Sequence, residues 1–295
     1  MLRQNKIQFG WLGIVGAGLL LCAATAALAG TTEQQERHFA VKDHAVVSID
    51  NIVNGRIEVK SWKNSEVVVT STSVPGKVAI EVEQVGDRID INASSLVPSS
   101  EPHEVEANFQ LLVPEQTELQ LRTQTGLILV EQVNGDMKLQ SVAGDVHLKE
   151  VSGYIIVKTT GGSLVCTLCS GKLEFTSISG GAQILQPSLN SVNLMTTTGN
   201  ILYDGEFIRT GLYTMNSGRG LVEVRFSGTD SFDLNAQTYR GTVDNQAADF
   251  LKPDTHGRHH PSSRYAHSLI GTVGQGLAKV ELTSYSGTIR ILKRN

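Results

Sequence analysis

Residues 121–205 read LRTQTGLILVEQVNGDMKLQSVAGDVHLKEVSGYIIVKTTGGSLVCTLCSGKLEFTSISGGAQILQPSLNSVNLMTTTGNILYDG. Glycine recurs every nine residues in this stretch, at Gly126, Gly135, Gly144, Gly153, Gly162, Gly171 and Gly180. The residues two and four places after each glycine are mostly apolar, and the residue between them is mixed. This two-residue alternation is typical of a strand with one buried face and one largely solvated face.

Each nine-residue unit therefore predicts a short strand followed by a corner. At the corner, the glycine and the small residue before it, such as Asn134 or Ser152, suit a positive φ or a close backbone approach. One unit cannot bury its apolar face alone, so stacked units must share a continuous core, as in a β-solenoid. After Gly180 the spacing lengthens by one residue, Asn190 takes the predicted corner, and Gly199 resumes the repeat. A glycine-rich β-sandwich with short, evenly spaced strands is the competing interpretation.

The first 29 residues have the pattern of a signal peptide. Arg3 and Lys6 precede an uncharged apolar run over residues 11–27, and Ala27-Leu28-Ala29 forms a small-x-small cleavage motif. The run is close to the length that spans a bilayer, so an uncleaved membrane anchor is the alternative. We expect an exported protein, periplasmic or at the cell surface, that contacts a membrane only if this segment is retained.

The composition of the rest of the chain excludes some classes of partner. Without Arg3 and Lys6 the 25 basic residues fall to 23, against 29 acidic ones, so the net charge is near −6. No basic run offsets this charge, which argues against binding to nucleic acid. Aromatic residues make up 5% of the sequence, and Trp62 is the only tryptophan after residue 29. We therefore expect no aromatic platform for stacking carbohydrate.

Alternating apolar residues predict strands on both sides of the repeat. Those before it are residues 45–49, 55–59, 66–70, 77–84, 88–93 and 106–113. We interpret residues 30–113 as an antiparallel β cap, because an uncovered solenoid edge would pair with other chains. Residues 114–295 form the predicted solenoid, interrupted by an irregular insert at residues 249–268.

Several segments occur in the order typical of one family. They are Asn54-Gly55-Arg56-Ile57-Glu58-Val59 ahead of Trp62 and residues 66–69, Leu111-Leu112-Val113-Pro114, the glycine units of residues 133–153, and Ser286-Gly287-Thr288-Ile289. In these segments the chain resembles a bacterial putative-adhesin family, a domain of unknown function built of β-strand repeats. The resemblance covers nearly all of the chain after residue 29. It implies an exported or membrane-anchored all-β protein with no established catalytic residues.

Two kinds of chemistry found in other β-helical repeats fit this sequence poorly. Calcium-binding β-rolls need acidic residues in successive turns, but only Asp136 and Asp145 directly follow a glycine of the repeat, and Tyr154 follows the next. A carbohydrate-cleaving β-helix needs two carboxylates in one groove, and the outward acids here are scattered among lysines and threonines. We expect no cofactor, and a carbohydrate-active envelope enzyme is the alternative function.

Two clusters of side chains are candidates for other chemistry. Cys166 and Cys169 occupy inward positions of the repeat, so they are either buried thiols or, in an oxidising compartment, a disulfide. Both interpretations stay open. His256, His259 and His260 lie in the insert and are candidate metal ligands, although an exposed loop also explains them.

Outward apolar residues indicate a contact surface. Leu129, Ile156 and Val165 point outward in the repeat. If successive units alternate between two sheets, Leu129 and Val165 share one face, with His147 between them. An apolar strip rimmed by charge marks an interaction site. The sequence therefore predicts a non-catalytic structural or binding surface for an envelope protein or polysaccharide.

Overall fold

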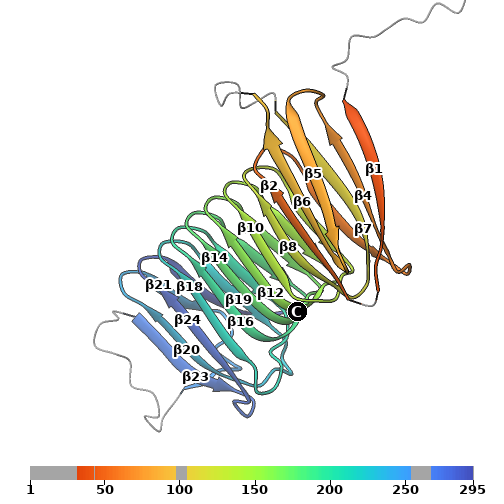
Figure 1. Cartoon of the computed structure of the whole chain (residues 1–295). Coiled ribbons are helices and arrows are strands. Elements are labelled where there is room, and N and C mark those ends of the chain that lie inside the picture. The colour runs from red at the N-terminus through yellow and green to blue at the C-terminus, as the bar shows by residue number, and fades with distance from the viewer. Residues whose placement is uncertain (1–31, 43, 98–104, 254–266, 295) are drawn as a thin grey trace, which may run out of the picture. The chain divides into compact units, whose positions relative to one another are not determined.

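Two β-sheets make up the part of the chain that the structure, a computed structural model, describes: residues 32–42, 44–97, 105–253 and 267–294 (Figure 1). All regular secondary structure in these residues is β-strand, as the sequence predicts. None of them forms a helix long and apolar enough to cross a membrane. The predicted signal segment, residues 1–29, lies outside the described residues.

The two sheets contain 12 and 13 strands and are called sheet A and sheet B. In spatial order, sheet A consists of β1 (Glu33–Ala40), β4 (Glu66–Ser73), β7 (Ala107–Pro114), β3 (Ile57–Trp62), β9 (Ile128–Glu131), β11 (Val146–Lys149), β13 (Leu164–Thr167), β15 (Ala182–Leu185), β17 (Ile201–Asp204), β19 (Val222–Phe226), β25 (Thr288–Lys293) and β21 (Thr242–Asn245). Sheet B consists of β22 (Lys252–Pro253), β23 (His267–Val273), β20 (Phe232–Thr238), β24 (Ala278–Ser284), β18 (Leu212–Ser217), β16 (Ser188–Thr196), β14 (Ser170–Ser177), β12 (Ser152–Thr159), β10 (Met137–Ser141), β8 (Thr117–Thr123), β2 (Ala45–Asn51), β6 (Arg88–Ser95) and β5 (Val78–Val85).

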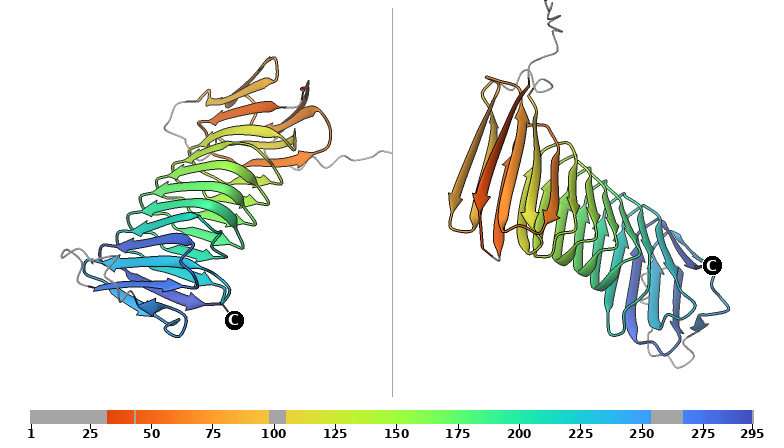
Figure 2. Two further views of the ribbon diagram at one scale, coloured as in Figure 1. Left: turned by 90° about the horizontal axis from the view of Figure 1, so that it is seen from below. Right: turned by 90° about the vertical axis from the view of Figure 1, so that its right-hand side faces the viewer.

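Successive nine-residue units lie alternately in the two sheets, so one coil of the solenoid takes two units. Each strand of the repeat pairs in parallel with the equivalent strand of the next coil, as in the pairs Val146↔Leu164 and Met137↔Ile155. Figure 2 shows the coils stacked on one another. The parallel ladders confirm the predicted β-solenoid, since a β-sandwich would pair its neighbouring strands in antiparallel fashion.

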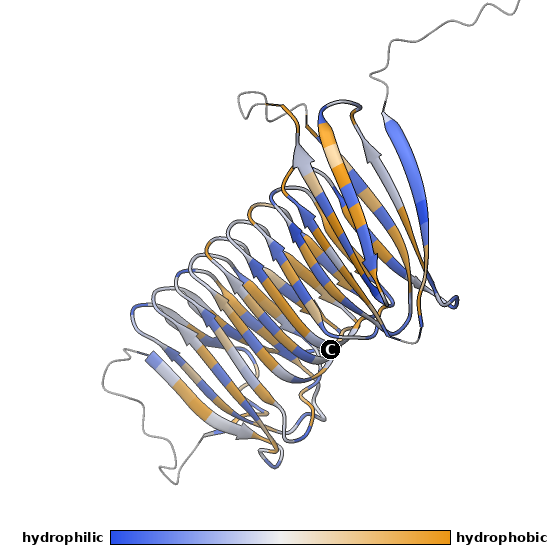
Figure 3. Ribbon diagram, in the orientation of Figure 1, coloured by the Kyte–Doolittle hydropathy of each residue, from blue (hydrophilic) through white to orange (hydrophobic). Residues whose placement is uncertain are grey.

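The two sheets enclose one apolar core made of the inward residues of every coil. Apolar and polar residues alternate along the strands, as the alternating colours of Figure 3 show. Leu148, Val157 and Phe175 are at most 2% exposed. Because burial of apolar surface drives folding and neighbouring coils share this core, no coil is expected to be stable alone.

Nine glycines form a column along the corner where the chain passes from sheet B to sheet A. In spatial order this glycine column is Gly55, Gly126, Gly144, Gly162, Gly180, Gly199, Gly220, Gly287 and Gly241. A Cβ atom at any of them would lie less than 3.0 Å from a carbonyl oxygen of the neighbouring coil, closer than real Cβ atoms come. Close approach of one backbone to the next is therefore what requires glycine here, as the sequence predicts.

A buried hydroxyl closes this corner in most coils. Seven glycine N–H groups of the column donate hydrogen bonds of 2.7–3.1 Å to the hydroxyl three residues earlier, in the pairs Ser141–Gly144, Thr159–Gly162, Ser177–Gly180, Thr196–Gly199, Ser217–Gly220, Thr238–Gly241 and Ser284–Gly287. Burying a hydroxyl or an amide without a partner would be costly, so each bond satisfies two polar groups at once. The pattern Ser/Thr-x-x-Gly is thus a second component of the repeat.

The opposite corner is built without a glycine at its turning point. The left-handed residues there are Gln132, Glu150, Leu168 and Gln186, with φ between 48° and 59°. Gly153 and Gly171, which the sequence places at these corners, are instead the second residues of β12 and β14. There a Cβ would again collide with the neighbouring coil, so close approach decides these positions too.

The extra residue near the end of the repeat is absorbed in a place that the sequence did not predict. In the pairing of β14 with β16, Leu189 is opposite Gly171 and Ser191 is opposite Lys172, so Asn190 forms a bulge. The prediction that Asn190 forms a corner is therefore wrong. A bulge adds one residue without turning over the face of the residues that follow, which explains why the repeat recovers its phase.

The N-terminal region is only partly the antiparallel cap that the sequence predicts. Antiparallel pairing holds for β5–β6 and for β1–β4–β7. However, β2 pairs in parallel with β8, and β3 pairs in parallel with β9, so these two strands form a coil of the solenoid. β6 and β7 form a further coil outside that one. The predicted boundary at residues 113 and 114 is not a boundary in the pairing.

The order of the coils is also broken at the C-terminal end. The last two strands, β24 and β25, form a coil between the coil of β18 and β19 and the coil of β20 and β21. Figure 1 shows β24 between β18 and β20. The end of the chain therefore inserts between two coils that precede it in sequence, and we call β24–β25 the inserted coil.

We predict that Gly180→Ala destabilises the protein far more than the neighbouring change Gly161→Ala. A Cβ at Gly180 would collide with the backbone of Gly162, whereas the nearest atom to a Cβ at Gly161 would be 3.6 Å away. We expect the free energy of unfolding to fall by about 2–4 kcal/mol for Gly180→Ala and by less than about 0.5 kcal/mol for Gly161→Ala. Urea denaturation followed by circular dichroism measures both. Equal effects would contradict the close approach at the glycine column.

Candidate functional site

The outer face of sheet A brings together the three residues that the sequence proposes as an interaction strip. Leu129 in β9 and Val165 in β13 are both register partners of His147 in β11. All three side chains are partly exposed, and we call them the apolar strip. Ile156, the other outward residue considered, lies in β12 of sheet B and belongs to the other face. Leu202, two strands beyond Val165, extends the same row.

A hollow of about 310 Å³ opens at the N-terminal end of the apolar strip. It lies over β4, β7, β3 and β9, and its side chains include Glu58, Lys60, Thr70, Gln110, Leu112, Leu129 and Glu131. Leu112 is 37% exposed, and Leu129 belongs to both the hollow and the strip. The strip and the hollow therefore form one continuous surface.

Charged side chains rim the hollow. Glu58 is ion-paired with Arg56. Beside the strip, Lys60, Glu131 and Lys149 are register partners on three neighbouring strands. Opposite charges on paired strands attract, so this row stabilises the face on which it lies. The result is an apolar centre with a polar rim, an arrangement suited to binding.

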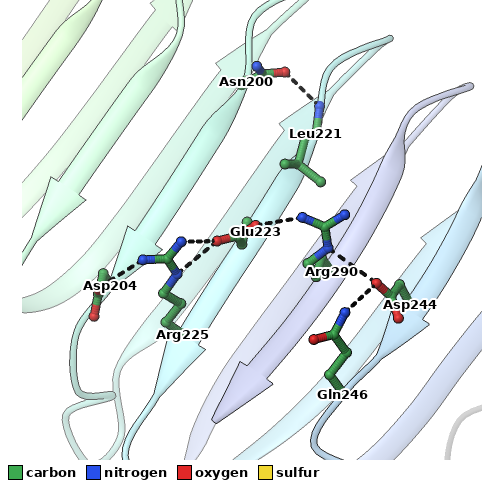
Figure 4. A network of polar contacts seen from close by, with 8 residues as sticks. All are labelled: Asn200, Asp204, Leu221, Glu223, Arg225, Asp244, Gln246 and Arg290. Carbon is green, nitrogen blue, oxygen red and sulfur yellow. Dashed lines mark hydrogen bonds and ion pairs between the residues drawn. The ribbon is translucent and has the colours of Figure 1, made fainter. Parts of the chain in front are cut away.

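A second polar cluster lies on the same sheet at its C-terminal end (Figure 4). Glu223 accepts hydrogen bonds from Arg225 at 2.7 Å and from Arg290 at 3.1 Å, and Arg290 also donates to Asp244 at 3.2 Å. The Glu223 side chain is only 8% exposed. A nearly buried carboxylate needs such charged donors, because removing an unpaired carboxylate from water would destabilise the fold. Hydrogen bonds to Asp244 and Glu223 raise the pKa of Arg290.

This cluster fastens the inserted coil to both of its neighbours. Arg290 belongs to β25, Glu223 to β19 on one side, and Asp244 to β21 on the other. Near the chain end, Arg294 forms an ion pair of 2.7 Å with Asp204 in β17. The contacts of the cluster are thus accounted for by holding the chain end in place, and we assign it a structural role.

The structure joins Cys166 and Cys169 in a disulfide, and both residues are fully buried. They flank the corner between β13 and β14, where Leu168 has a φ of 56°. This left-handed residue turns the chain so that two inward side chains meet. The disulfide is one of the two interpretations that the sequence left open, and it leaves no thiolate at this position to act as a nucleophile.

The metal site proposed at three histidines stays a prediction. His256, His259 and His260 lie outside the described residues. Among residues 32–42, 44–97, 105–253 and 267–294, no group of three His, Cys, Asp or Glu side chains is placed to hold a metal ion.

The two aspartates that follow glycines of the repeat bond to the backbone of the next coil. Asp136 accepts a hydrogen bond of 3.0 Å from the N–H of Tyr154, and Asp145 accepts one of 2.7 Å from the N–H of Ser163. Each carboxylate therefore satisfies a backbone donor between coils. This is a structural use of the residues that would begin a calcium-binding repeat.

His38 and Asp230 are among the other titratable groups whose pKa values are shifted for structural reasons. His38 in edge strand β1 bonds to Glu36 and Glu66, each at 3.0 Å, and these bonds raise its pKa. Burial raises the pKa of the Asp230 carboxyl, although the N–H groups of Phe207 and Ser227 donate to it and oppose this shift. Neither residue lines the hollow.

Sequence reasoning missed the part of the hollow that β3, β4 and β7 contribute. It placed residues 55–59 in the N-terminal cap, as a strand separate from the repeat. Yet Ile57 and Val59 follow Gly55 at the same two spacings as in the core units. Treating Gly55 as the first glycine of the repeat would have placed Glu58 beside Leu129, as the structure does.

The family model Toastrack DUF4097 matches residues 54–292. The chain belongs to the Toastrack DUF4097 family. The Toastrack match extends from the glycine that opens the column to the end of the inserted coil, and it confirms the family resemblance drawn from the sequence. A comparison with curated proteins found no match.

Several solved structures resemble this Toastrack protein at low identity. A putative adhesin from Bacteroides fragilis NCTC 9343 is 10% identical, with 89% of this chain and 98% of that chain covered and a TM-score of 0.42. A putative cell adhesion protein from Clostridium sporogenes ATCC 15579 is 9% identical, with 90% and 100% covered and a TM-score of 0.28. A putative lipid binding protein from Parabacteroides distasonis ATCC 8503 is 11% identical, with 90% and 98% covered and a TM-score of 0.26. At these identities and TM-scores, the similarities say nothing about what this chain binds.

We predict that Glu223→Gln weakens the attachment of the inserted coil. The change leaves the guanidinium groups of Arg225 and Arg290 facing a neutral amide in a nearly buried position. We expect the free energy of unfolding to fall by about 1–3 kcal/mol and amide exchange in β25 to become faster. Glu281→Gln, at an exposed carboxylate of β24 in the other sheet, is the matched control and should cost less than about 0.5 kcal/mol. Equal losses would refute the proposed role of the cluster.

We predict that Cys166 and Cys169 are oxidised in the protein purified without reductant. Its mass should be lower than that of the reduced chain by two hydrogen atoms. After unfolding without reductant, neither cysteine should react with iodoacetamide, and after reduction both should. Two reactive thiols in the unfolded, unreduced protein would show instead that these residues are simple core thiols.

Proposed function

We propose that this Toastrack protein is an exported, non-catalytic, adhesin-like protein that binds an envelope component through the outer face of sheet A. The contact surface comprises the apolar strip and the hollow beside it. The partner is an envelope protein or polysaccharide, reached in the periplasm or at the cell surface. Membrane contact through residues 1–29 would require that this segment is retained as an anchor.

One observation carries this proposal: Leu129 joins the apolar strip to the hollow. The parallel register sets Leu129, His147 and Val165 on adjacent strands, and the hollow continues the apolar surface to Leu112. Apolar side chains grouped in this way, with charge around them, are a common feature of contact surfaces.

A carbohydrate-active enzyme is the second candidate, because the carboxylates of Glu58 and Glu131 line the same hollow. A hydrolase of this kind needs one carboxylic acid to protonate the leaving group and one carboxylate as base or nucleophile. Glu58 is ion-paired with Arg56, so this carboxylate already has a partner within the chain. Binding accounts for the hollow without this difficulty.

We predict that the double variant Leu129→Lys, Val165→Lys loses binding to purified envelope fractions. Two ammonium groups in the middle of the strip would have to be desolvated on contact, so affinity should fall at least tenfold. Binding is measured by sedimentation of the labelled protein with envelope membranes and, separately, with purified envelope polysaccharide.

Ile156→Lys is the matched control, because it places the same charge at an outward apolar position of sheet B. This variant should bind like the unchanged protein. Unchanged binding by the double variant, with its fold verified by circular dichroism, would exclude the strip as the contact surface. Glycan hydrolysis by the protein, abolished in Glu131→Gln, would overturn the non-catalytic function.

A further inference from the structure

Two exposed tyrosines stack on each other on the ridge beside the glycine column. Tyr239 follows β20 and Tyr285 follows β24, and the inserted coil makes them neighbours. Their ring centroids are 5.2 Å apart, and their planes are inclined by 15°. The side chains are 40% and 52% exposed. The low aromatic content of the sequence predicts no such platform, because composition does not show which aromatic residues the fold brings together.

The nearest cation leaves the outer face of the stack open. The Arg240 guanidinium carbon lies 5.7 Å from the Tyr239 ring centroid and 5.8 Å from that of Tyr285. These two distances and the 5.2 Å between the rings form a nearly equilateral triangle, so the guanidinium lies beside the stack. A cation on the outer face of Tyr285 would be much further from Tyr239. Arg240 therefore contacts both tyrosines without covering the outer face of Tyr285.

The neighbouring coil has no side chain at the position beside Tyr285. Gly218 takes the equivalent position in that coil, where its carbonyl accepts a hydrogen bond of 2.9 Å from the N–H of Ser286. A Cβ at Gly218 would come within 3.0 Å of the Thr197 carbonyl oxygen, so no side chain fits there. The ridge position of Thr197 is two strand spacings from that of Tyr285, about 9.5 Å. One ring stacked about 4 Å from Tyr285 fits into this distance.

One arginine lies on each side of the inserted coil at this corner. Arg219 and Arg240 each directly precede a glycine of the column, as Ser286 does in the inserted coil between them. Both arginines are exposed. In the part of the chain that the structure describes, neither is ion-paired with a carboxylate. A local excess of positive charge on an acidic chain favours an anionic ligand, and guanidinium groups bind carboxylates with two parallel hydrogen bonds.

From this geometry we propose that the ridge formed by Tyr239, Tyr285, Gly218, Arg219 and Arg240 binds an acidic sugar ring, a carboxylated pyranose unit of a glycan. The apolar C–H face of the sugar stacks on the free face of Tyr285 above Gly218. Its carboxylate accepts hydrogen bonds from the arginines, and the phenol groups meet its hydroxyls. This ridge is separate from the outer face of sheet A, so this proposal does not depend on the function proposed above.

The test compares trigalacturonic acid with its methyl ester, which keeps the rings and removes the charge. We expect isothermal titration calorimetry to show binding of the acid and at least tenfold weaker binding of the ester. Tyr285→Ala should weaken binding of the acid at least tenfold, because the stacking face is lost. The double variant Arg219→Gln, Arg240→Gln should bind the acid and the ester equally. Ile178→Ala, at an exposed position of the same ridge two coils from Gly218, should change neither.

Each of the following outcomes would overturn the proposal. The unchanged protein fails to bind trigalacturonic acid, it binds the ester as tightly as the acid, or Tyr285→Ala leaves binding intact. If Tyr285→Ala does not fold, the double variant Arg219→Gln, Arg240→Gln still tests the site. A double variant that binds the acid more tightly than the ester, as the unchanged protein does, would contradict the proposal. A single-stranded oligonucleotide that displaces trigalacturonic acid and binds more tightly than it would indicate a site for stacked bases. That result would also contradict the proposal.

Discussion

The close approach of one coil's backbone to the next at the glycine column is the constraint on which this structure depends. A carbonyl oxygen of each coil occupies the space that a Cβ of the next would need, so glycine is required at Gly144, Gly162 and Gly180 in turn. The buried hydroxyl three residues earlier then accepts the glycine N–H. Together they form a corner that is both tight and free of unsatisfied polar groups. The corner sets the spacing of the strands, and the spacing puts equivalent outward residues in one row.

The same corner is used where the chain abandons sequence order. Gly287 stacks between Gly220 and Gly241, although it follows both in the sequence. A repeat of identical corners makes every coil a possible neighbour of every other, so an additional interaction must select the order. The cluster of Arg290 with Glu223 and Asp244 supplies one, because it forms only when β25 lies between β19 and β21. At the opposite end, β2 and β3 lie inside the coil of β6 and β7 in a similar reversal of order.

The sequence predicted what depends on the period and missed what depends on the order of the coils. Glycine spacing and alternation were sufficient to predict the solenoid, and alternate placement of units put Leu129, His147 and Val165 on one face. The predicted corner at Asn190 was wrong. A corner and a bulge can each accommodate one extra residue, and both leave the same spacing between Gly180 and Gly199. The contact of Glu58 with Leu129 and the stacking of Tyr239 on Tyr285 depend on strands that are not consecutive. No local pattern encodes such neighbours, although Ser/Thr-x-x-Gly recurs at Thr238–Gly241 and Ser284–Gly287 and marks the two coils whose order is exchanged.

Nuclear Overhauser contacts among the column glycines test the account most directly. In protein labelled at glycine, the account predicts cross-peaks from Gly287 to both Gly220 and Gly241, each one strand spacing of about 4.8 Å away. It predicts no cross-peak between Gly220 and Gly241, which lie two spacings apart. A direct cross-peak between Gly220 and Gly241, with none to Gly287, would show that the coils stack in sequence order. That result would contradict the inserted coil, the role of the Arg290 cluster and the tyrosine ridge together.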